Sequence, residues 1–94
     1  MVRYFIKVKG KVQGVGFRKY TKKIAKRYNV VGWVRNVADG TVEAEIQGKV
    51  NGVDQVIKAL NRGSSSSKVR SIEVNKMKGL KKYNSFKIIY NLKV

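Results

Sequence analysis

Hydrophobic and polar residues alternate at the start of the chain and then repeat at helical spacing. The apolar side of residues 3–10 consists of Tyr4, Ile6 and Val8, and the alternate positions are polar except for Phe5. This alternation predicts a strand with one buried face. The apolar residues that follow at helical spacing are Phe17, Tyr20, Ile24, Ala25 and Tyr28. With lysines and arginines between them, they predict an amphipathic helix of about three turns.

The later segments predict a hairpin, a second helix and two more strands. Residues 30–35 are rich in β-forming residues, and residues 42–46 alternate after an Asp39-Gly40 turn signal, which predicts the hairpin. Apolar residues at helical spacing in 53–60 predict the helix, and Gly63 is placed to end it in a left-handed conformation. The last strands are expected around residues 69–77 and 86–90.

This order of elements favours one fold class. A β-α-β-β-α-β order with a final strand is typical of an α+β, ferredoxin-like (βαββαβ) sandwich, in which two helices cover one face of a mostly antiparallel sheet. The 94 residues contain no low-complexity tract or linker, so we expect a single domain over residues 1–94.

A loop with two glycines precedes the first predicted helix. Gly14 and Gly16 allow a tight backbone whose N–H groups can converge on an anion, although a plain strand-to-helix turn explains them about as well. Arg18 favours the anion site, because a cation at the positive end of a helix is unfavourable unless an anion is bound there.

Two segments in this order carry a family resemblance. Residues 10–18 (GKVQGVGFR) followed by residues 31–36 (VGWVRN) resemble the acylphosphatase family, and similar segments at 40–44, 47–48, 63–64 and 83–90 extend the resemblance over nearly the whole chain. The resemblance implies the same ferredoxin-like fold. It also implies hydrolysis of the carboxyl–phosphate bond of acyl phosphates to a carboxylate and inorganic phosphate, without a cofactor or a metal.

The resemblance assigns roles to particular residues. Those implied to bind the substrate phosphate are Gln13, Gly14, Val15, Gly16, Phe17 and Arg18. Asn36 matches the asparagine that positions the attacking water, whereas its residue type alone favours a turn residue that closes the strand. An amide suffices for this reaction, because a carboxylate leaving group needs no protonation and the substrate's phosphate oxygens can accept the proton of the water.

The charge of the chain leaves a second function open. Twenty-two Lys and Arg against five Asp and Glu give a net charge of +17, so partners should be anionic, although much of the charge can be solvated surface. The alternative function is a catalytically idle, basic nucleic-acid-binding module on the same fold. The enzyme is favoured, with a small acyl phosphate as its partner and inorganic phosphate as its product.

Missing residue types exclude several classes of protein. The chain has no cysteine and no histidine, which excludes phosphocysteine and phosphohistidine mechanisms, and its few acids argue against a binuclear metal site. No apolar stretch is long enough to span a bilayer and no signal segment is recognised, so we expect a cytoplasmic protein. Lysines scattered along the strands disfavour edge-to-edge association, and we expect a monomer.

Two further groups of side chains have simple structural interpretations. Glu43 and Glu45 share the strand face opposite the apolar one, so we expect both to face solvent. Four aromatic residues could stack on bases, but their spacing places them more simply in the core. They are Phe17, Tyr20, Tyr28 and Trp33.

Overall fold

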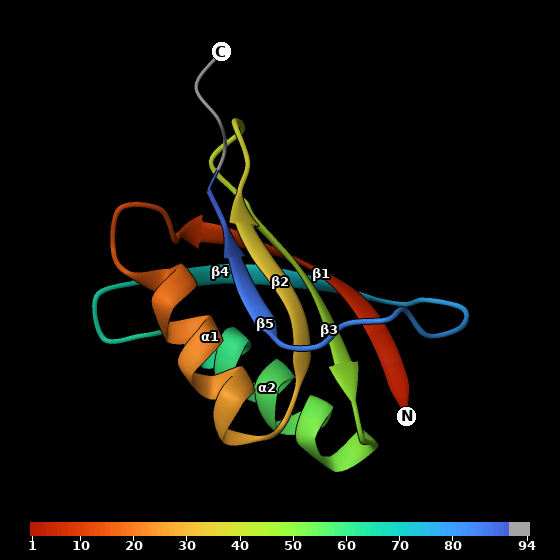
Figure 1. Ribbon diagram of the computed structural model, residues 1–94. Coiled ribbons are helices and arrows are strands. Elements are labelled where there is room, and N and C mark those ends of the chain that lie inside the picture. The colour runs from red at the N-terminus through yellow and green to blue at the C-terminus, as the bar shows by residue number, and fades with distance from the viewer. Residues whose placement is uncertain (91–94) are drawn as a thin grey trace.

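The computed structural model describes residues 1–90, which form a five-stranded sheet with two helices packed on one face (Figure 1). The elements are β1 (Val2–Lys11), α1 (Phe17–Arg27), β2 (Val31–Asn36), β3 (Val42–Gly48), α2 (Val50–Arg62), β4 (Lys68–Lys76) and β5 (Phe86–Ile89). The strand order is β4-β1-β3-β2-β5, and of the four pairings only β2 with β5 is parallel. The predicted ferredoxin-like sandwich and its order of elements are confirmed.

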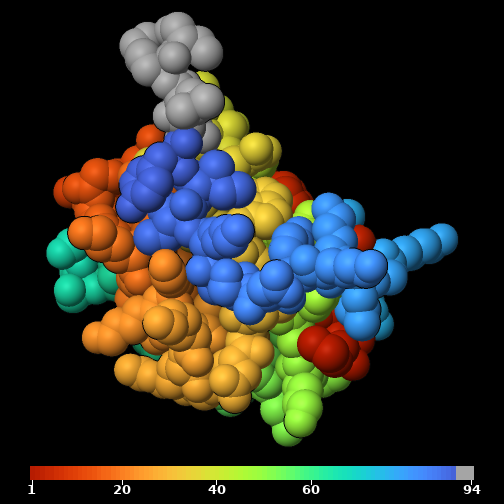
Figure 2. Space-filling model, in the orientation of Figure 1, coloured from red at the N-terminus to blue at the C-terminus, as the bar shows by residue number. Residues whose placement is uncertain are grey.

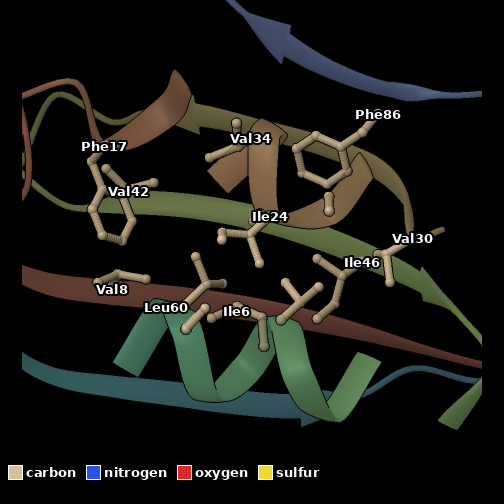
Figure 3. Close-up of a cluster of buried hydrophobic side chains, with 14 of the residues drawn as sticks. Ile6, Val8, Phe17, Ile24, Val30, Val34, Val42, Ile46, Leu60 and Phe86 are labelled. Carbon is tan, nitrogen blue, oxygen red and sulfur yellow. The ribbon is translucent and has the colours of Figure 1, made fainter. Parts of the chain in front are cut away.

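The core lies between the helices and the sheet (Figure 3). Ile6 and Val8 from β1, Phe17 from α1 and Leu60 from α2 are each at most 1 % exposed. Burying a side chain of this size contributes roughly 1.5–3 kcal/mol. The alternation in β1 and the helical spacing in α1 therefore each present one apolar face to the same core, as the sequence predicts.

The β2–β3 turn closes as its sequence indicates. The Val37 N–H donates to the Thr41 carbonyl (2.9 Å), and the Gly40 N–H donates to the Val37 carbonyl (3.0 Å). Asp39 accepts hydrogen bonds from both the backbone N–H and the hydroxyl of Thr41. These bonds, side chain first, lower the pKa of Asp39 and so favour the charged form that holds the turn.

Gly63 ends α2, but in a different conformation from the predicted one. Its φ is +81°, as expected for glycine, whereas its ψ of 171° is extended rather than left-handed helical. The chain leaves the helix directly into a turn in which Ser67 Oγ accepts from the Ser64 N–H and donates to the Ser64 carbonyl. The positive φ makes this exit depend on glycine, and a Cβ there would also lie 2.7 Å from Ser67 Oγ.

The second face of the sheet corrects two expectations. Glu45 is only 6 % exposed, because the segment 77–85 crosses over it and Arg3 and Tyr83 both donate hydrogen bonds to its carboxylate. Trp33 also lies outside the helix-facing core: it packs edge to face on Phe5 and donates to the Tyr83 hydroxyl. Strand alternation placed Glu45 correctly on the face away from the helices, whereas the expectation that Trp33 lies in the core was wrong. Alternation contains no information about a distant segment that covers that face.

Of the helices in residues 1–90, neither α1 nor α2 is long and apolar enough to cross a bilayer.

Candidate active site

The loop between β1 and α1 is shaped by two glycines. Gly14 and Gly16 have φ values of +72° and +75°. A Cβ added at either position would meet no atom within 4 Å, so the requirement for glycine comes from the backbone conformation and not from crowding. A left-handed conformation costs other residues roughly 1–2 kcal/mol.

Buried side chains anchor the loop at both ends. Val12 precedes the loop and Phe17 follows it, and each is 1 % exposed. The first turn of α1 closes when the Tyr20 N–H donates to the Gly16 carbonyl (3.0 Å). Arg18 therefore follows directly after a residue that is fixed in the core, which limits where its guanidinium can lie.

These elements form a pocket with a volume of about 340 Å³. Its walls are Val12, Gly14, Gly16, Phe17, Arg18, Lys19, Asn36 and Tyr90. The structure thus brings five of the predicted site residues together: Gly14, Gly16, Phe17, Arg18 and Asn36. None of the lining residues is acidic, and two carry a positive charge, so the pocket is suited to a small anion.

The sheet positions Asn36 at the pocket. It is the last residue of β2 and lies opposite Val42 of β3. Asn36 is half-buried and sits where β2 ends, so the sheet holds an amide group next to the loop that carries Arg18.

Gln13 and Val15 do not line the pocket. The Gln13 side-chain amide donates to the carbonyl groups of Val37 (2.7 Å) and Thr41 (2.9 Å). It thereby ties the glycine loop to the turn that follows Asn36. Val15 packs partly buried against the core. The two side chains support the loop, and any contact with an anion from these residues would come from the backbone.

Tyr90 is a pocket residue that the sequence analysis missed. The guanidinium carbon of Arg18 lies 4.8 Å from the centre of the Tyr90 ring, within the range of a cation–π interaction. Tyr90 follows β5, which pairs in parallel with β2, and this pairing brings the residue beside Asn36. No local pattern identifies it, because the contact depends on a parallel pairing of distant strands.

Within residues 1–90, no three His, Cys, Asp or Glu residues lie close enough together to hold a metal ion.

The chain is similar to acylphosphatases along nearly its whole length. The Acylphosphatase family model matches residues 4–88. An acylphosphatase from Bacillus licheniformis is 42 % identical over 90 residues, which cover 96 % of this chain and 100 % of that protein. The crystal structure of acylphosphatase from Bacillus subtilis superposes with a TM-score of 0.92 at 39 % identity, covering 96 % of this chain and 100 % of that chain.

A structure of an acylphosphatase from Coxiella burnetii has a TM-score of 0.89 at 27 % identity and covers 94 % of this chain and 92 % of that chain. Both the sequence and the fold agree with one family over almost all of each relative's length. The chain belongs to the acylphosphatase family.

Proposed function

We propose that this protein hydrolyses the carboxyl–phosphate bond of acyl phosphates by holding the phosphate in the residue 13–18 loop with Arg18 and by orienting a water molecule with Asn36. The activity follows from membership of the acylphosphatase family, which makes the chain a hydrolase acting on acyl phosphates. The assignment of roles to residues rests on one observation, the pocket that joins Gly14, Gly16, Arg18 and Asn36.

Phosphate binding is the role of the loop and the start of α1. The first N–H groups of a helix have no partner within the helix, and its dipole is positive at that end. Arg18 adds a planar guanidinium that can donate two parallel hydrogen bonds to phosphate oxygens. The pocket therefore offers backbone donors and a fixed charge to the three oxygens of the phosphoryl group, which is what phosphoryl transfer mainly requires.

Asn36 acts on the water. Its side-chain carbonyl can accept a hydrogen bond from a water molecule and so direct the oxygen toward phosphorus. The new bond forms between this oxygen and phosphorus, the bond from phosphorus to the acyl oxygen breaks, and the carboxylate leaves with the electron pair. The proton of the water passes to a phosphate oxygen of the substrate. No acid or base from the protein takes part.

Hydrolysis of benzoyl phosphate without added metal, measured beside equilibrium binding of inorganic phosphate, tests these roles. We expect Arg18→Ala to lose both binding and turnover, and Asn36→Ala to lose turnover by about 10²–10³-fold while phosphate still binds. Arg62→Ala and Asn61→Ala are matched controls, because both residues are exposed at the end of α2. Activity that survives in either pocket variant would exclude the assigned role.

Membership of the family does not by itself establish the domain organisation, the oligomeric state or the location of the protein. We propose that residues 1–94 act as one domain, as a monomer and in the cytoplasm, which sedimentation and cell fractionation would test. The comparisons give the nucleic-acid-binding alternative no support.

A further inference from the structure

A second cleft lies beside the other end of α1, with a volume of about 620 Å³. It is bordered by the later turns of α1 and by the starts of β2 and β5. Figure 2 shows this face of the molecule, with α1 in orange next to β5 in dark blue. The cleft shares no lining residue with the candidate active site, so it is a separate feature of the surface.

Three lysines line this cleft. Lys22 and Lys26 extend from successive turns of α1, and Lys87 comes from β5. Within residues 1–90 none of the three forms an ion pair. Two positive charges four residues apart on a helix repel each other, and no acidic residue occurs in α1 to relieve them. An anion in the cleft would neutralise these charges.

The base of the cleft is apolar. Val30 and Phe86 are 2 % and 3 % exposed, and Val31 beside them is half-buried. Val30 and Phe86 belong to the core beneath the cleft, and Val31 is the one of the three that remains partly exposed there. The volume also falls within the roughly 300–1,000 Å³ that small-molecule sites occupy. Apolar surface next to several cations matches a ligand that has both an apolar body and negative groups.

We propose that this cleft binds a small organic anion with an apolar or aromatic body and at least two phosphate or carboxylate groups. The apolar body contacts Val31, and the negative groups pair with Lys22, Lys26 and Lys87. The proposal does not depend on the catalytic roles of Arg18 and Asn36.

Fluorescence titration with bis-ANS, an aromatic dye with two sulfonate groups, tests the site. We expect one dye per chain, with affinity reduced about tenfold or more in Lys22→Ala/Lys26→Ala, because each lost charge-assisted contact is worth about that factor. The control Lys23→Ala/Lys58→Ala removes the same charge from exposed lysines outside the cleft and should change affinity far less. Equal losses in the two double variants would overturn the proposal.

Further titrations distinguish dye binding in the cleft from dye binding in the active site and identify the ligand chemistry. At constant ionic strength, a saturating concentration of inorganic phosphate should leave dye binding unchanged, as should Arg18→Ala. Displacement of the dye by phosphate together with loss of dye binding in Arg18→Ala would place the dye in the catalytic pocket and contradict the proposal. Val31→Ser should lower the affinity for the dye, because it removes an apolar contact. Competition by ATP or by phthalate distinguishes a phosphorylated ligand from a carboxylated one, and failure of both to compete would also count against the site.

Discussion

Arg18 occupies a position that an isolated helix would disfavour. It lies in the first turn of α1, where the helix dipole is positive, and Lys19 follows it. Phe17 in the core and the Tyr90 ring over the guanidinium hold it there. Packing therefore holds the positive charge of Arg18 at the positive end of the helix, and a bound anion would relieve the resulting repulsion.

Replacing Tyr90 tests whether its ring positions Arg18. We expect Tyr90→Leu to raise KM for benzoyl phosphate about two- to fivefold with a smaller effect on kcat, because an exposed cation–π contact is worth about 0.5–1 kcal/mol. Steady-state kinetics measure both constants. Tyr90→Phe keeps the ring and should behave like the wild type. A KM unchanged in the leucine variant would show that the stacking does not contribute.

Gln13 is expected to position the loop relative to Asn36. Its amide group bridges the carbonyl groups of Val37 and Thr41, so Gln13→Ala removes both links between the loop and the turn. We predict a fall in kcat of about tenfold, since small displacements of positioning groups are costly in rate. Thermal unfolding serves as the control, and a loss of activity matched by general unfolding would mean that Gln13 is only structural.

At the scale of elements, β1 and β3 are joined to the segment 77–85 by a buried cluster. Arg3 donates to the Glu45 carboxylate and to the carbonyl groups of Lys78 and Gly79, and Tyr83 donates to the same carboxylate. Burial alone would raise the pKa of Glu45. The hydrogen bonds from Tyr83 and Arg3, with the charges of Lys81 and Arg3, outweigh it, so the pKa is lowered. The cluster thus requires a charged Glu45.

Glu45 should make the stability of the fold depend on pH in the acidic range. Because its pKa is lower in the folded state, the stabilisation is complete above the ordinary value of 4.5 and is lost as the pH falls through the folded pKa. Glu45→Ala should cost about 3–5 kcal/mol at neutral pH by leaving Arg3 buried without its counter-charge. Denaturant unfolding between pH 7 and about pH 3 measures both effects.

Glu73 provides the matched control for Glu45. It pairs with Lys9 at 2.9 Å on exposed β-strand surface, where solvent screens the interaction. Glu73→Ala should therefore change stability little at any pH. Similar losses of stability in Glu45→Ala and Glu73→Ala would show that burial does not make the Glu45 ion pair more important.

At the scale of the whole molecule, the net charge of +17 should draw anionic substrates toward the surface. We expect kcat/KM for benzoyl phosphate to fall about tenfold between low salt and about 1 M, where the Debye length is about 3 Å, while kcat changes little. Steady-state kinetics in sodium chloride would measure this. A parallel fall in kcat would point to disruption of the site and not to loss of attraction.

Much of the fold could be predicted from local patterns. The alternation around Ile6 and the helical spacing from Phe17 each predicted one buried face, and the glycines of the loop indicated a tight backbone, which the structure forms with positive φ values. The burial of Glu45 could not be predicted in this way. It depends on Tyr83, 38 residues away, and period-two alternation identifies only which face a side chain occupies.

The sequence by itself determined the elements, their apolar faces, the glycine loop and the excess of positive charge, because these depend on residue type and on spacing within a few turns or strand positions. The family resemblance also predicted that Asn36 shares a site with Arg18, although the residue type of Asn36 favoured a plain turn. Tertiary structure alone decided that Tyr90 meets Arg18 and that three lysines surround a cleft. The physical reason is that the pairing of β2 with β5 and the packing of α1 beside them join segments far apart along the chain. Local periodicity does not determine which distant segments come into contact.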